Sequence, residues 1–156
     1  MLFDSASLAA IGGVLALVGG LIGSSIGIGI AASAGTATLA EEPGQFRNVI
    51  ILASLPMTQT FYGLIVLILV ITAVVPNIVA NGGSGAMVLG AGLIAGAAEC
   101  FSAIYQGNVC ASGISVLPKT KGRILTNAIM LAVFVELLGV LGLVFTIMSL
   151  TMLGLM

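Results

Sequence analysis

Two of the five acidic residues in this sequence, Glu99 and Glu136, lie inside long apolar segments. A charged side chain at the centre of a membrane costs at least ~2.5–3.5 kcal/mol, so an ionisable residue at that depth indicates a function by default. Glu136 has no polar side chain within one helical turn of itself in the sequence. It therefore needs polar partners from other segments, and with them it could bind and release a cation.

A second apolar segment has polar side chains in a helical pattern. Leu55, Thr58, Gln59 and Tyr62 are spaced at i, i+3, i+4 and i+7, so they lie along one face of a helix. Pro56 lies within this stretch, and because a proline cannot donate to the helix ladder, it can free a nearby backbone carbonyl. This face therefore offers hydroxyl, amide and carbonyl oxygens together.

Polar residues of three segments lie at the same depth. Each is 12 or 13 residues from a basic residue of a polar connection: Gln59 from Arg47, Gln106 from Lys119 and Glu136 from Arg123. At 1.5 Å per residue each is about 18–20 Å from that basic residue, near the middle of the membrane. Together they offer hard oxygen ligands, which suit a small monovalent cation stripped of water. The alternative, a hydrogen-bond cluster that only joins helices, would not need an isolated carboxylate.

The composition requires a membrane environment for these residues. Hydrophobic residues make up 60% of the 156 and charged residues only 6%, whereas a soluble domain has about 25% charged residues. Four dispersed basic residues cannot form a nucleic-acid surface. With no histidine and two cysteines, the chain cannot assemble a zinc, haem or iron–sulfur site. We therefore expect an integral membrane protein with no nucleic-acid partner.

Polar connections divide the chain into four apolar segments, each longer than the ~20 residues that cross a bilayer as a helix. They cover about residues 7–39, 48–75, 85–116 and 124–155. The predicted fold is an all-α membrane protein of four transmembrane helices, arranged as two hairpins over residues 1–80 and 81–156.

The basic residues predict the orientation of these helices. All four lie in the first and third connections, namely Arg47, Lys119, Lys121 and Arg123. By the positive-inside rule, the loops at about residues 40–47 and 117–123 lie in the cytoplasm and both termini lie outside.

Glycines gather in the first and third segments in a pattern that predicts close helix packing. In the first, a small residue recurs every four positions, at Gly19, Gly23, Gly27, Ala31 and Gly35; in the third, a similar stripe begins at Gly92, Gly96 and Cys100. Small residues at this spacing let helix backbones approach closely in lipid. Ordinary packing inside a four-helix monomer is the alternative. We favour a tight inner layer of the first and third helices in a closed, homo-oligomeric ring, which heterologous interfaces generate.

The two halves of the chain are similar in layout. Pro43 and Pro118 occupy equivalent turns 75 residues apart, and Gln59 and Glu136 are equivalent at a separation of 77. The pattern predicts a duplicated hairpin. The first copy then has an amide where the second has the acid, so one carboxylate serves four helices.

These motifs together resemble a known family. The stretch Leu55–Gly63, the pair Gln106–Gly107 and the late pair Val135–Glu136, set in a doubled hairpin with a glycine-rich first helix, look like the membrane rotor subunit of V-type ATPases. The chain is similar to this proteolipid, or K subunit, in its bacterial sodium-pumping form, over nearly its whole length. Met57 and Thr60 stand where the sodium-type motif has small residues.

The resemblance implies that Glu136 is the ion-carrying carboxylate. It implies that sodium is ligated by side-chain oxygens and one backbone carbonyl, and that a tyrosine locks the carboxylate: Thr58, Gln59, Gln106, the carbonyl of Leu55, and Tyr62. Such a protein does not hydrolyse ATP and has no covalent cofactor. Its partners are identical protomers in a ring, a stator membrane subunit, a central-stalk subunit at the cytoplasmic loops, and lipid. The implied location is the bacterial plasma membrane.

Two alternatives stay open. The same rotor could carry H⁺ through reversible protonation of Glu136, although proton-carrying relatives generally lack the full amide and hydroxyl set. A small dimeric secondary transporter with one essential membrane carboxylate would work by alternating access. Glu99, seven residues before Gln106 on the same helix face and about 10 Å toward the outside, is interpreted as a structural, largely neutral carboxyl and not as a ligand.

Overall fold

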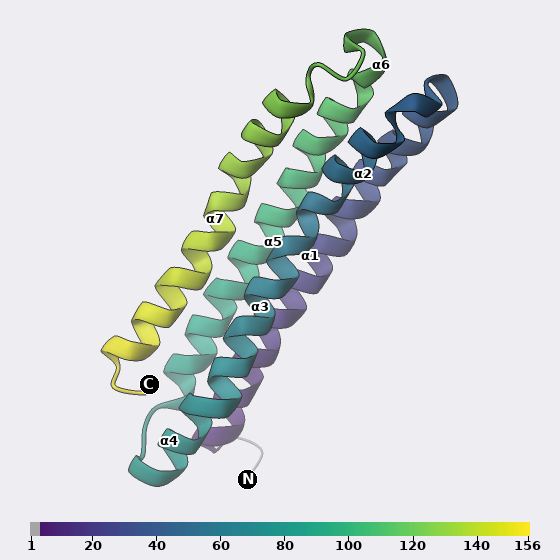
Figure 1. Cartoon of the computed structure of the whole chain (residues 1–156). Coiled ribbons are helices and arrows are strands. Elements are labelled where there is room, and N and C mark those ends of the chain that lie inside the picture. Colours follow the sequence, from purple (N-terminus) through teal and green to yellow (C-terminus); the bar gives the residue numbers. More distant parts are fainter. Residues whose placement is uncertain (1–3) are drawn as a thin grey trace.

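The computed structural model describes residues 4–156, which form four long helical spans joined by short connections (Figure 1). The first span is α1 (Ser5–Glu41). The second consists of η1 (Pro43–Gln45), α2 (Phe46–Ser54), η2 (Leu55–Met57), α3 (Thr58–Leu69), η3 (Val70–Val74) and α4 (Val75–Asn81). The third is α5 (Gly85–Ser115), and the fourth is α7 (Leu125–Met152), preceded by the short α6 (Leu117–Thr120). All four spans are long and apolar enough to cross a membrane, which confirms the prediction of an all-helical, four-span membrane protein.

The second span is continuous but departs from regular α-helix at two prolines. Leu55–Met57 form a 3-10 turn around the buried Pro56, and Val70–Val74 form a π-helical turn just before Pro76. A proline lacks an N–H group and its ring clashes with the carbonyl four residues earlier, so a wider turn accommodates it without ending the helix. For this reason the span continues to Asn81, beyond the predicted end at residue 75.

The connections lie at opposite ends of the bundle. The connection between α1 and α2 and the one that contains α6 lie together at one end, and the 82–84 loop lies with the two chain ends at the other (Figure 1). The first two connections touch, because a Cβ added to Gly122 would lie 2.8 Å from the side-chain nitrogen of Asn48. At the opposite end, Asn77 donates a 3.2 Å hydrogen bond to the carbonyl of Gly154. Gly154 has a left-handed φ of 67°, which follows the end of α7 at Met152.

The first helix is capped at its outer end. The Oδ1 atom of Asp4 accepts a 2.9 Å hydrogen bond from the backbone N–H of Ser7, as an N-cap residue does. Hydrogen bonding from Ser7 lowers the pKa of the Asp4 carboxyl, so this exposed residue is ionised at neutral pH.

Helices α1 and α5 form the tight inner layer that the glycine stripes predict. A Cβ at Gly23 would lie 2.5 Å from the carbonyl oxygen of Cys100, and one at Gly19 would overlap the backbone of Gly96. Gly107 is packed in the same way against the backbone of Gly27. Because these backbones touch with no side chain between them, α1 and α5 hold a fixed register against each other.

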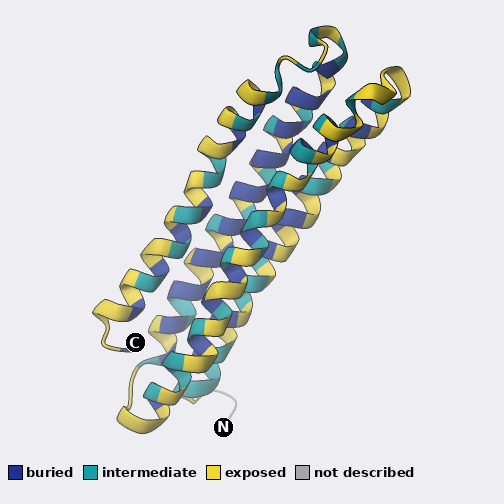
Figure 2. Cartoon of the chain, in the orientation of Figure 1, coloured by how far each residue is buried: buried dark blue, intermediate teal, exposed yellow. Residues whose placement is uncertain are grey.

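The surface of the bundle is apolar over its length. Buried residues follow the inward faces of the helices, and exposed residues follow the outward faces (Figure 2). Among the exposed side chains are large hydrophobic ones, such as Ile22, Ile68, Phe101, Phe134 and Leu138. An apolar surface of this kind is stable only against lipid or against other protein chains.

Candidate cation site

The carboxylate of Glu136 is held by two other helices. The hydroxyl of Tyr62 in α3 donates a 2.9 Å hydrogen bond to Oε1 of Glu136, and Nε2 of Gln106 in α5 donates a 3.1 Å hydrogen bond to Oε2. Each oxygen of this α7 residue therefore has its own donor from a different span. Hydrogen bonds to an ionised carboxylate are among the stronger ones in proteins, so this arrangement fixes the orientation of the acid.

Two glutamines extend the network from Glu136 into the bundle. Gln59 and Gln106 are both completely buried. Nε2 of Gln59 donates a 3.0 Å hydrogen bond to Oε1 of Gln106, whose own Nε2 lies 3.4 Å from the carbonyl of Ala132 as well as against Glu136. The structure therefore brings together the three residues that the depth arithmetic placed at one level.

Three oxygens of the second span lie close together beside these glutamines. Oγ1 of Thr58 is 3.1 Å from the backbone carbonyl oxygen of Leu55 and also 3.1 Å from Oε1 of Gln59. A hydroxyl has one hydrogen, so it cannot donate fully to both oxygens at once. The cluster has more acceptors than donors, which is the local chemistry of a cation ligand set.

The 3-10 turn accounts for the position of the Leu55 carbonyl. Pro56 has no N–H group, and the turn from Leu55 to Met57 directs the carbonyl of Leu55 toward the N–H and hydroxyl groups of Thr58. The turn is held from the other side by α1, because a Cβ at Gly27 would lie 2.9 Å from Cβ of Pro56. The proline thus produces the local departure from α-helix that the sequence indicated.

Ser102 is a member of the network that the sequence analysis did not identify. Its hydroxyl accepts a 3.0 Å hydrogen bond from Nε2 of Gln59 and donates a 3.0 Å hydrogen bond to the carbonyl of Val135, next to Glu136. Ser102 precedes Gln106 by four residues, so helical spacing places both on one face of α5. That spacing was the signal that could have identified it.

Glu99 lies close to this network but is not bonded to it. The side chain is completely buried, and neither carboxyl oxygen has a hydrogen-bond partner among residues 4–156. Its Oε2 atom and the Oγ atom of Ser102 lie 2.9 and 3.1 Å from the point where a Cβ of Gly139 would stand. The two carboxyl side chains therefore occupy neighbouring levels of the α5–α7 interface.

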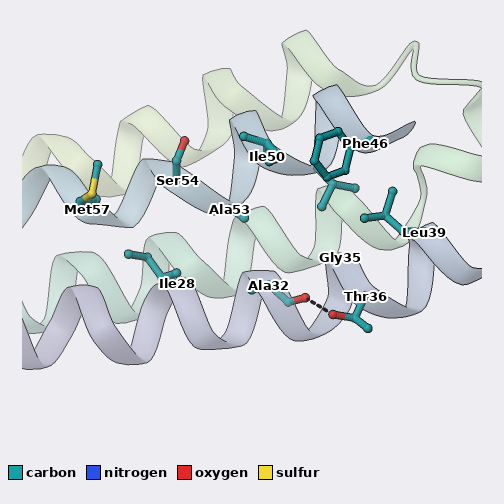
Figure 3. A pocket seen from close by; sticks show the side chains of 11 residues that line it. Ile28, Ala32, Gly35, Thr36, Leu39, Phe46, Ile50, Ala53, Ser54 and Met57 are labelled. Carbon is teal, nitrogen blue, oxygen red and sulfur yellow. Dashed lines mark hydrogen bonds between the residues drawn. The ribbon is translucent and has the colours of Figure 1, made fainter. Parts of the chain in front are cut away.

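The site differs from the grooves on the outside of the bundle. A groove of about 430 Å³ lies between α1 and α2, lined by apolar residues such as Ile28, Leu39 and Phe46 (Figure 3). No carboxylate lines this groove. In the described part of the chain, no group of three or more His, Cys, Asp and Glu side chains could hold a metal ion together. The oxygen network around Glu136 is thus built from one acid and neutral groups.

Comparisons with known proteins agree with this architecture. The model of the ATP synthase C family, which describes the C-type membrane proteins of ATP synthases, matches the chain twice, over residues 11–70 and 89–149. The V-type sodium ATPase subunit K of Enterococcus hirae is 35% identical over 123 residues, which are 79% of this chain and 77% of that protein. The A-type ATP synthase subunit K of Methanocaldococcus jannaschii is 33% identical over 147 residues, 94% of this chain and 63% of that longer protein. These matches confirm the resemblance inferred from the motifs, and the chain belongs to the ATP synthase C family.

Proposed function

We propose that the chain is an ion-carrying protomer of the rotor ring of a rotary, ATP-driven pump, and that it binds Na⁺ at Glu136. One observation supports this above all: a single membrane carboxylate, oriented by Tyr62 and Gln106, lies beside a cluster of neutral oxygens. Membership of the family supports the rotor role, and the relative named as part of a sodium ATPase supports the ion. The chain itself performs no hydrolysis, which takes place on other subunits.

The proposed ligands of Na⁺ are oxygens that already lie around one another. They are the carboxylate of Glu136, the side-chain oxygens of Thr58, Gln59 and Gln106, and the backbone carbonyl of Leu55. Gln106 now directs its N–H toward the carboxylate, and half a turn of its terminal amide presents its oxygen instead. Tyr62 keeps its hydrogen bond to the other carboxylate oxygen, so Glu136 stays in place while the ion is bound.

The proposed partners follow from the same role. Identical protomers form the ring, and a stator membrane protein supplies a cation that displaces Na⁺ from Glu136 by electrostatic repulsion. The central stalk contacts the loops at residues 40–47 and 117–123, which we place in the cytoplasm of a bacterium, with both termini outside the plasma membrane and lipid around the ring. Each hairpin, residues 1–80 and 81–156, is proposed to be one copy of a duplicated unit, and the double family match supports this.

Carbodiimide labelling in native membranes tests the ion. These reagents attack a protonated carboxyl, so Na⁺ bound to ionised Glu136 should protect it. We expect labelling of Glu136 at low Na⁺ and loss of labelling at millimolar Na⁺, measured by mass spectrometry of the intact chain. The variant E136Q should take up no label at that position and serves as the blank.

The outcome separates sodium from proton coupling. Labelling that stays constant at every Na⁺ concentration and every pH tested would contradict Na⁺ binding and favour reversible protonation of Glu136. Protection by Na⁺ that strengthens as the pH rises is the result expected here, because fewer protons then compete for the carboxylate.

A further inference from the structure

Glu99 is a second carboxyl inside the membrane, and it occupies a space that α7 leaves for it. A Cβ at Gly139 would lie 2.9 Å from Oε2 of Glu99, and one at Gly142 would lie 3.8 Å from Oε1. Both glycines are buried. The surface of α7 opposite Glu99 is therefore free of side chains, and the carboxyl fits against its backbone at full burial.

An ionised Glu99 would have no counter-charge. All four basic residues lie in the connections at one end of the bundle, far from the middle of α5. No hydrogen bond reaches either carboxyl oxygen from the described residues. A buried charge without a partner takes up or loses a proton rather than stay ionised, so Glu99 requires a cation of its own.

The neighbourhood of Glu99 selects the kind of cation. A metal cation stripped of water needs several oxygen ligands, and the polar oxygen beside the carboxyl is that of Ser102. The hydroxyl hydrogen of Ser102 is already directed to the carbonyl of Val135, but its oxygen can accept one further hydrogen bond beside the one from Gln59. A proton needs only one carboxyl oxygen and one acceptor, and this site provides both.

We propose that Glu99 is a second cation-binding carboxyl of the protomer, specific for a proton, which it retains while Glu136 exchanges its ion. The proton completes a chain of polar groups: Glu99 donates to Ser102, Ser102 donates to Val135, and Gln59 joins Ser102 to Gln106. The protomer then has one ionised carboxylate in the membrane, and one Na⁺ neutralises it. Exchange at Glu136 rests on the proposed function, whereas the proton on Glu99 does not.

Infrared spectroscopy of the purified assembly tests the proton directly. A protonated carboxyl has a C=O stretching band that an ionised carboxylate lacks. The other three acidic residues, Asp4, Glu41 and Glu42, are exposed at the ends of the bundle and ionised at neutral pH. We expect the variant E136Q to show this band at neutral pH, and the double variant E99Q/E136Q to lose it. The matched surface variant E41Q should keep the full wild-type signal.

The absence of the band in E136Q, or its survival in the double variant, would overturn the proposal. The wild-type protein in saturating NaCl gives an independent comparison with E99Q alone, should E136Q fail to assemble. If Glu136 does not bind Na⁺, labelling of Glu136 becomes insensitive to Na⁺, but the band in E136Q still reports Glu99. The two proposals therefore fail in different experiments.

The affinity for Na⁺ provides a second readout. Because a protonated Glu99 is neutral, E99Q should change the Na⁺ dissociation constant of the wild-type site by less than about threefold. An ionised Glu99 within about 10 Å of the bound ion would attract it, and its removal would then weaken binding by about tenfold or more. The second result would contradict the proposal.

Discussion

The two oxygens of Glu136 are each held by a different helix, and this decides what single substitutions do. Tyr62 binds Oε1 from α3, and Gln106 binds Oε2 from α5. Gln106 is completely buried and is itself fixed by Gln59. Tyr62, in contrast, is only partly buried and stands at the edge of the network. Removing the tyrosine hydroxyl should therefore affect the ion and leave the fold intact.

The variant Y62F removes the hydrogen bond to Glu136 and retains the aromatic ring. A hydrogen bond to a charged group contributes roughly 1.5 kcal/mol or more, so we expect Na⁺ affinity to fall about tenfold with no loss of assembly. Sodium-dependent protection of Glu136 from carbodiimide provides the measurement. The control is Y105F, because Tyr105 is 60% exposed on the outer face of α5. Equal affinities for Y62F and wild type would show that the hydroxyl has no part in holding the ion.

Ser102 predicts an effect on stability. The variant S102A leaves the amide of Gln59 without one acceptor and frees the carbonyl of Val135. Interhelical hydrogen bonds in membranes contribute on average about 0.6 kcal/mol each, so the loss of two should lower stability by about 1 kcal/mol. Thermal unfolding in detergent is the assay. Ser112 is exposed and donates only to the Asn108 carbonyl of its own helix, so S112A should unfold like wild type; an unchanged melting temperature for S102A would argue against the network.

The residues of the site were predictable to different degrees. Glu136, Gln59 and Gln106 stood out because acids and amides are rare in apolar segments and their depths could be calculated. Ser102 did not, because a serine hydroxyl in a helix commonly bonds to the carbonyl four residues earlier, as those of Ser112 and Ser115 do here. Only the packing of α5 against α7 directs Ser102 elsewhere.

At the scale of the helices, the α1–α5 contact is the most demanding feature. The backbones of Gly23 and Cys100 lie so close that a methyl group at Gly23 would be 2.5 Å from a carbonyl oxygen. Gly29, six residues later in the same helix, has no heavy atom within 4 Å of its Cβ position. The two glycines therefore allow the same substitution to be compared in two environments.

We expect G23A to be destabilised by at least about 1–3 kcal/mol through overpacking, and G29A to behave like wild type. Melting of the helical circular dichroism signal in detergent would measure both. If the two variants melted together, the close approach of α1 and α5 would not limit stability.

The sequence predicted the elements well because length and hydropathy alone select membrane-spanning helices. It predicted the inner pair because a four-residue glycine spacing has few other uses. The π-helical turn at Val70–Val74 was not predicted, and the second span was consequently ended too early. A proline either ends a helix or is accommodated within it, and the outcome depends on neighbouring helices that a single segment does not reveal.

The whole molecule has an apolar outer surface interrupted by grooves on two sides. One groove lies between α1 and α2, and another lies between α5 and α7, lined by residues including Phe101, Tyr105 and Leu138. Because the two faces differ, a contact between one face and the other is heterologous, and repetition of such a contact closes into a ring.

Assembly size is therefore the prediction at this scale. Purified in mild detergent, the protein should migrate as one large, uniform complex, and negative-stain images should show closed rings. A species of two chains would instead support the dimeric transporter that the sequence left open. A G29A sample, unaltered in its internal packing, would show whether the exposed face of α1 contributes to contacts between protomers.

The amide at Gln59, in the position that is occupied by an acid in the second half of the chain, sets the energetics of the proposed pump. With one exchangeable charge for four helices, a complete rotation moves half as many ions as a rotor of equal helix number with an acid in every hairpin. The same expenditure of ATP is then divided among half the ions, so each can be driven against twice the free energy. Since that free energy depends on the logarithm of concentration, at zero membrane voltage the attainable concentration ratio is squared. Exchanging one carboxylate for an amide thus favours steep gradients over high throughput.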